Sequence, residues 1–145
     1  MKKVSIGIIV GILGGFNMND IELFLNQQKT KSSQELIYEY IDRFFQIKNL
    51  SPKDSYIYNK ANIDRRLFSK FRYGNYHLSK NNLLKLCIAL ELDIQETNEV
   101  LGSAGYVLST NQEFDLILRY FIINRDYNLS KINEQLYSMT ENDLT

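Results

Sequence analysis

Helix start signals, each followed by apolar residues at helical spacing, recur along the chain after residue 30 and restrict its fold more than any other feature. Ser32 with Glu35 and Asp93 with Glu96 have capping-box spacing, in which two side chains satisfy the first N–H groups of a helix. Behind the first box, apolar residues recur every three or four positions, which marks one face of a helix. No convincing alternating pattern of a strand appears after residue 20. The sequence therefore predicts an all-α fold.

The same signals predict where each helix lies. We expect helices over about 33–48, 52–60, 65–72, 79–90, 94–101, 112–124 and 129–139. Pro52 suits a first helical position, because its missing N–H needs no partner there. Asn62 tolerates a left-handed turn, Asp64 and Ser79 cap the helices that follow them, and Gly74 ends one helix.

The N-terminal segment does not follow this pattern. Val4 to Phe16 is apolar, contains four Gly and has 13 residues, which is too short for a helix across a bilayer. Three interpretations stay open: a strand or loose tail, the remnant of a preceding domain, or a membrane-directing segment. We expect an apolar, irregular segment over residues 1–30, a helical domain over 31–108, and a helical extension packed on it over 109–145.

Composition and motifs argue against an enzyme. One Cys and one His exclude an internal disulfide and a Cys/His zinc site. The chain has no phosphate-binding Gly loop and no nucleophile elbow. His77 has no partner motif, and Cys87 lies on an apolar helix face, where a thiol behaves as a small hydrophobe. We predict a cytoplasmic protein with no enzymatic activity, metal or cofactor, and association with a membrane through residues 4–16 is the lesser alternative.

Charge is distributed unevenly along the chain. The 17 basic and 17 acidic residues cancel, so the net charge indicates no partner. Residues 53–85, however, carry eight basic and two acidic side chains, whereas residues 86–145 carry three basic and ten acidic ones. A basic middle can mark an anion-binding face that the total conceals, and a mixed solvated surface is the alternative.

The region 54–101 resembles a known DNA-binding fold. Its first part predicts a short helix, the turn Ala-Asn-Ile-Asp and a second short helix, and LLKLCIALELDIQETNEVL predicts two more. With the helix at 33–48, this resembles the five-helix domain of the Cro/phage-repressor (XRE) helix-turn-helix family, over about half of the chain. The strings NIDRRLFSKFRYGNY, AGYVLS and FDLILRYFI more loosely resemble the helical tails of bacterial macrodomain-containing proteins.

The resemblance to the repressor family implies a small bacterial transcriptional regulator whose helix at about 64–72 enters the major groove of double-stranded DNA. The expected base-reading residues are Arg65, Arg66, Ser69 and Lys70. The expected phosphate contacts are Lys53, Lys60, Arg72, Lys80 and Lys85.

Two departures from the family favour an alternative function. Tyr58 stands where the family commonly has a small residue, and the carboxylate of Asp54 would repel an approaching phosphate. The alternative is a non-enzymatic protein-interaction or antitoxin-like module that keeps the fold and binds a protein partner.

Leu84 and Ile88 form a second apolar face on the helix that begins after Ser79. We expect the C-terminal helices to cover it, and a homodimer is the alternative. The apolar residues available for this are Phe114, Leu116, Ile117, Tyr120, Phe121 and Leu136.

Overall fold

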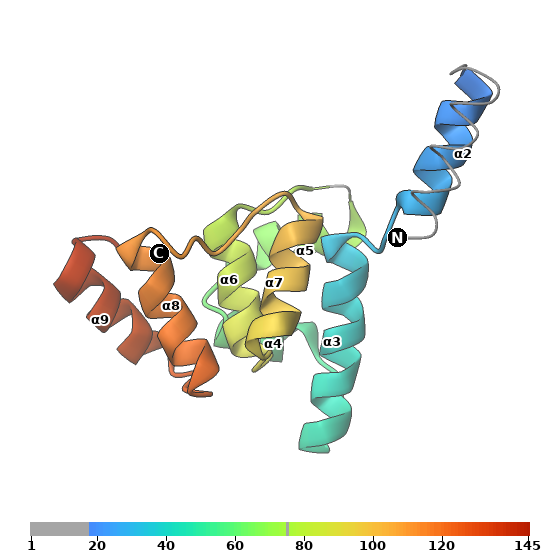
Figure 1. Ribbon diagram of the computed structural model, residues 1–145. Helices are drawn as coiled ribbons and strands as arrows, with labels where there is room; N and C mark the ends of the chain where they lie inside the picture. The colour runs from blue at the N-terminus through green and yellow to red at the C-terminus, as the bar shows by residue number, and fades with distance from the viewer. Residues whose placement is uncertain (1–17, 75) are drawn as a thin grey trace. The chain divides into compact units, whose positions relative to one another are not determined.

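The computed structural model describes residues 18–74 and 76–145, and all regular secondary structure in these residues is helical (Figure 1). The chain divides into two compact units, residues 1–31 and 32–145. None of the described helices combines the length and the apolar character that a membrane-spanning segment requires. The predicted all-α fold is thus confirmed for the described residues.

In the first unit the structure describes one helix, α2 (Met18–Gln28). This helix is not predicted from the sequence, because the preceding residues contain four glycines, which argue against a helix and all lie before residue 16. The apolar stretch Val4–Phe16, with its three interpretations, lies outside the described residues.

The second unit contains the remaining helices, and most of their predicted bounds are confirmed to within one or two residues. They are α3 (Ser33–Lys48), α4 (Asp54–Lys60), α5 (Arg65–Tyr73), α6 (Lys80–Ala89), α7 (Ile94–Ser103), α8 (Glu113–Ile123) and α9 (Leu129–Thr140). Both predicted capping boxes form, at Ser32 and at Asp93. The side chains of Asp64 and Ser79 accept hydrogen bonds from the first backbone N–H groups of α5 and α6.

One predicted start was wrong. Pro52 was expected at the first position of a helix, but α4 begins at Asp54. The backbone of Lys53 is extended and forms the N-cap, so Pro52 lies before the helix in the connecting segment.

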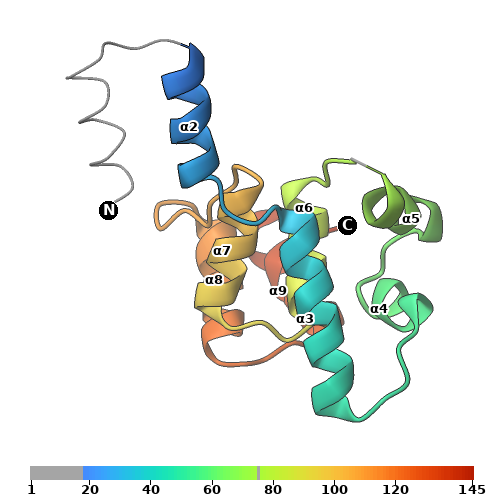
Figure 2. The same ribbon diagram turned by 90° about the vertical axis from the view of Figure 1, so that its right-hand side faces the viewer.

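Helix α6 occupies the middle of this unit and packs against α4, α7 and α9 (Figure 1). Helix α3 packs against α7, and α8 packs against α7 and α9. Figure 2 shows α4 and α5 on one side of α3, with α7 and α8 on the other. The α4–α5 pair and the α8–α9 pair are thereby two separate parts of the surface.

The second apolar face of α6 is covered within the chain. Leu84 and Ile88 are 0% and 1% exposed, and α9 contributes the buried side chains of Ile132 and Leu136 to the same core. Of the two C-terminal helices, α9 packs against α6, whereas α8 packs against α7 and α9.

The side chains expected to provide this cover do so only in part. Phe121 and Leu136 are buried, and Phe114 and Ile117 are half-buried. Leu116 and Tyr120, which we also expected against α6, are 44% and 63% exposed. The buried face of α8 instead includes Leu118 and Ile122, because the helix is apolar on several sides and its period does not select one of them.

Candidate nucleic-acid interface

A tight turn joins α4 to α5. Ala61 is completely buried, and Asn62 has a φ of 53°, the left-handed conformation expected for it. The Ile63 N–H donates to the Tyr58 carbonyl at 2.8 Å, and the carboxylate of Asp64 then accepts from two N–H groups of α5. These local bonds fix the direction in which α5 leaves α4.

Side chains of α3 hold the other end of α5. The Gln34 amide donates to the Phe71 carbonyl at 2.6 Å and lies within 3.2 Å of the Gly74 carbonyl, and the Tyr38 hydroxyl donates to the Arg72 carbonyl. The last carbonyls of α5, which have no partner within the helix, are therefore satisfied by a second element. Neither positioning residue is predicted from the sequence, because no motif links side chains to carbonyls more than thirty positions away.

One face of α5 is buried and apolar, and the other is exposed and basic. Phe68 and Phe71 are each 2% exposed and pack in the core. The four expected base-reading residues are all exposed on the other side, and they are Arg65, Arg66, Ser69 and Lys70. None of the three cations forms an ion pair with a carboxylate in the described part of the chain.

A groove of about 560 Å³ separates these cations from α4. Ser55 and Tyr58 line it from α4, and Arg65, Arg66 and Ser69 line it from α5. The Tyr58 ring packs on the Phe68 ring with their centroids 5.7 Å apart. The large side chain of Tyr58 therefore fills space between α4 and α5.

The Asp54 carboxylate, which the sequence analysis expected to repel phosphate, is paired with a cation. Its Oδ2 lies 3.0 Å from the Nε of Arg72, whose guanidinium also stacks 4.8 Å above the Tyr38 ring. This ion pair neutralises the negative charge of Asp54 at the groove. Its cation, Arg72, is one of the expected phosphate contacts.

Two more of the expected phosphate contacts form ion pairs inside the unit. The Lys60 ammonium donates to the Ala89 carbonyl at 2.7 Å and lies 3.0 Å from the Glu91 carboxylate. The Lys80 ammonium lies 2.8 Å from Oδ2 of Asp115, a carboxylate whose side chain is only 6% exposed. Both cations connect helices of the unit.

Lys85 and Lys53 are the remaining two expected phosphate contacts, and their environments are opposite. Lys85 is 7% exposed, its ammonium donates to the Asn62 carbonyl at 3.1 Å, and burial lowers its pKa. Lys53 is exposed at the N-cap of α4 and has no ion pair with a described carboxylate. Of the five, Lys53 alone is both exposed and without such a pair.

His77 contacts another side chain of the fold, and Cys87 lies in the core. The Tyr106 hydroxyl donates to the Leu78 carbonyl at 2.9 Å, and Nε2 of His77 lies 2.9 Å from the same hydroxyl oxygen. Cys87 is completely buried, and burial raises the pKa of its thiol to about 12. The described residues also contain no cluster of three or more potential metal ligands.

Comparison with known proteins finds no matching family model, no similar curated protein and no similar solved structure. What α4 and α5 bind is therefore inferred from their own side chains.

Proposed function

We propose that α3–α7 form a repressor-like helix-turn-helix domain and that the protein binds double-stranded DNA through α5 in the major groove, as a small transcriptional regulator. One observation carries this proposal: Arg65, Arg66 and Lys70 project from the outward face of a helix that is fixed at both ends, and no described carboxylate neutralises them. Arginine is the commonest side chain to bind a guanine edge, because its guanidinium matches O6 and N7 with two hydrogen bonds.

A fixed recognition helix favours sequence-specific binding. The Asp64 cap holds the beginning of α5, and Gln34 and Tyr38 hold its end. The arginine side chains therefore start from a backbone that does not have to be ordered when DNA binds, which lowers the entropic cost of each contact.

A second candidate function is a protein-binding module of the antitoxin-like kind. The ion pairs of Lys60, Arg72 and Lys80, together with the burial of Lys85, favour it. A DNA-binding protein gains much of its affinity from cations that release counterions at phosphates, and four such candidates are already engaged here. A protein with an acidic surface would still bind the three cations of α5.

Titrating the full chain with random and genomic DNA fragments at several salt concentrations tests the proposal. Arg65→Ala/Arg66→Ala should lose about 1–3 kcal/mol of specific binding for each bidentate contact removed, with little change in melting temperature. The control Lys48→Ala/Arg119→Ala removes two positive charges from α3 and α8, outside the α4–α5 groove, and should keep most of the specific affinity.

Unaltered DNA affinity in Arg65→Ala/Arg66→Ala would exclude α5 as the reading helix. A wild-type protein that binds no DNA fragment better than any other, even at low salt, would favour the protein-binding alternative.

A further inference from the structure

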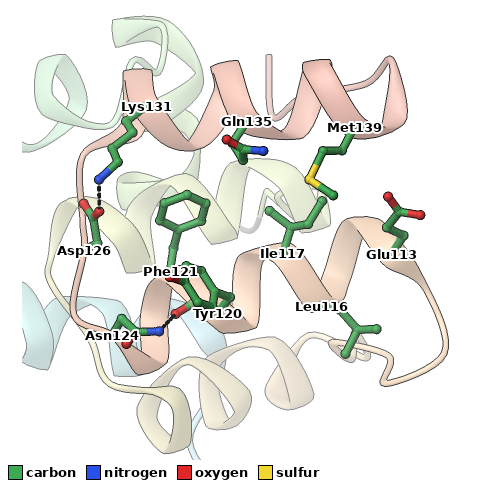
Figure 3. A pocket seen from close by; sticks show the side chains of 10 residues that line it. All are labelled: Glu113, Leu116, Ile117, Tyr120, Phe121, Asn124, Asp126, Lys131, Gln135 and Met139. Carbon is green, nitrogen blue, oxygen red and sulfur yellow. Dashed lines mark hydrogen bonds and ion pairs between the residues drawn. The ribbon is translucent and has the colours of Figure 1, made fainter.

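Two grooves on the described surface differ in whether their cations are paired. The groove between α8 and α9, of about 650 Å³, has one cation, Lys131, which pairs with Asp126 at 2.6 Å (Figure 3). The groove between α4 and α5 has one carboxylate, Asp54, whose charge Arg72 neutralises at 3.0 Å. Its own cations form no ion pair with a described carboxylate, and they are Arg65, Arg66 and Lys70. The charges of the α4–α5 groove therefore favour an anionic ligand.

Exposed tyrosine rings lie beside these three cations. Tyr73, the last residue of α5, lines the groove and is 77% exposed, although the Arg72 guanidinium lies 5.6 Å from its ring centroid. Tyr76 is 47% exposed, and its ring centroid lies 5.8 Å from the Lys70 ammonium. Neither ring packs in the hydrophobic core. Both are therefore available to stack on a planar group of a ligand.

We propose that this surface binds single-stranded DNA, with phosphates at the three cations and unpaired bases stacked on Tyr73 and Tyr76. A single strand supplies both negative charge and planar rings, the two features that the surface matches. In a duplex the bases stack on one another and present only their edges to a protein, so the tyrosine rings gain no stacking contact there. An acidic protein segment supplies the charge, but its carboxylate side chains carry no ring. None of the contacts proposed requires a 2′-hydroxyl, so DNA satisfies all of them.

This activity adds to the proposed duplex binding and does not depend on it. Both ligands use the cations of α5, so a single strand and a duplex should compete for the protein. Only the single strand uses the two tyrosine rings, and this difference allows the two activities to be measured separately.

The number of contacts sets the expected affinity and its salt dependence. Three phosphate contacts on a single strand predict a slope of about −2 for the logarithm of the affinity against that of the salt concentration. Helix α5 has 9 residues and is about 14 Å long, so the contacts extend over only a few nucleotides. We therefore expect reversible binding in the micromolar range with little preference for base sequence.

Fluorescence anisotropy of labelled oligothymidylate with the full chain tests the stacking. Tyr73→Leu/Tyr76→Leu should raise the dissociation constant about 100-fold, because each stacked base contributes about 10-fold. Tyr73→Phe/Tyr76→Phe keeps both rings and should stay within about three-fold of the wild type. Tyr137→Leu is the matched control, because Tyr137 is 62% exposed on α9 and does not line the α4–α5 groove, and it should bind as the wild type does. All the replaced side chains are exposed, and circular dichroism should show that the variants keep their helices.

Duplex and RNA measurements separate this activity from others. Tyr73→Leu/Tyr76→Leu should bind duplex DNA within about three-fold of the wild type, because the rings contribute only to the single strand. Oligouridylate and oligodeoxyuridylate differ only in the 2′-hydroxyl and should bind within about three-fold of each other. A protein that binds single strands but prefers no duplex sequence would refute the proposed function and support this inference.

Three results would overturn the proposal. They are a wild type that binds no single strand even at low salt, a Leu variant that binds as tightly as the Phe variant, and an RNA strand bound more than about 10-fold tighter than the matching DNA. The first result would leave the cations to duplex DNA or an acidic protein. The second would show that the cations alone hold the strand, and the third would make RNA the ligand.

Discussion

Removing the Asp115 carboxylate should destabilise the protein more than removing any exposed charge. Asp115 lies in the first turn of α8 and is 4% exposed. Its Oδ2 lies 2.8 Å from the Lys80 ammonium at the beginning of α6 and accepts from the Ser109 N–H at 2.8 Å. One oxygen atom thus connects α6, α8 and the segment between α7 and α8.

The expected magnitude follows from the groups that lose their partner. Asp115→Ala leaves the Ser109 N–H and a partly buried ammonium without an acceptor, and hydrogen bonds to charged groups contribute about 1.5–3 kcal/mol each. Because the Lys80 side chain is 30% exposed and water replaces part of its contact, we expect a total loss of about 3 kcal/mol. Asp115→Asn keeps an oxygen for the Ser109 N–H and should lose less, about 1–2 kcal/mol.

Urea unfolding followed by far-UV circular dichroism measures these losses. Lys80→Ala should lower the free energy of unfolding less than Asp115→Ala does. The double variant should lose about 1 kcal/mol less than the sum of the two single losses, because the two side chains share one contact. An Asp115→Ala variant within about 0.5 kcal/mol of the wild type would refute this reasoning, since ordinary surface substitutions fall in that range.

The same Lys80→Ala variant separates a structural role from a DNA contact. If Lys80 only supports the fold, the variant lowers stability and leaves the salt dependence of DNA binding unchanged. A phosphate contact would instead lower the slope of the salt dependence by about one.

Three further predictions follow from burial and charge. Phe68→Ala and Leu86→Ala should each cost about 2–5 kcal/mol in urea unfolding, and a loss near zero would mean that these helices pack differently. Leu84→Lys should unfold or aggregate in gel filtration, because it buries an ammonium without a partner, and a folded, soluble variant would contradict the covered face of α6. A hydrogen bond from Arg43 holds the pKa of Glu96 below its ordinary value of 4.5, so this carboxylate stabilises the fold above that pH and stops doing so as the pH falls through its lowered pKa. Glu96→Gln should therefore be less stable by about 1 kcal/mol or less at neutral pH and lose less stability in acid unfolding, and equal acid sensitivity in both proteins would contradict this.

The helix caps were predictable from the sequence because each depends on a few neighbouring residues. Ser32 and Asp93 each bond to the backbone N–H three positions later, and Asp64 to those two and three positions later. Such bonds require only that the chain begins a helix, and no distant contact decides them. The start of α4 differed because a suitable Pro52 permits a helix start without requiring one.

The sequence does not predict which basic side chains form ion pairs with carboxylates within the fold. Lys60 meets Glu91, and Lys80 meets Asp115, across 31 and 35 positions of the chain. A count of charges over residues 53–85 treats these lysines as equal to Arg65, although only packing shows which of them already have carboxylate partners. The predicted arginines are therefore exposed without a carboxylate partner among the described residues, whereas three expected phosphate contacts form ion pairs and Lys85 is buried.

Helix α8 shows why an apolar stripe does not identify the face that a helix buries. Leu118 and Ile122 are buried against the rest of the chain, whereas Leu116 and Tyr120 remain exposed on another side of the same helix. A helix that is apolar on most of its sides is normally covered on most of them. The described part of the chain covers α8 on one side only, and the spacing of its apolar residues does not show which side that is.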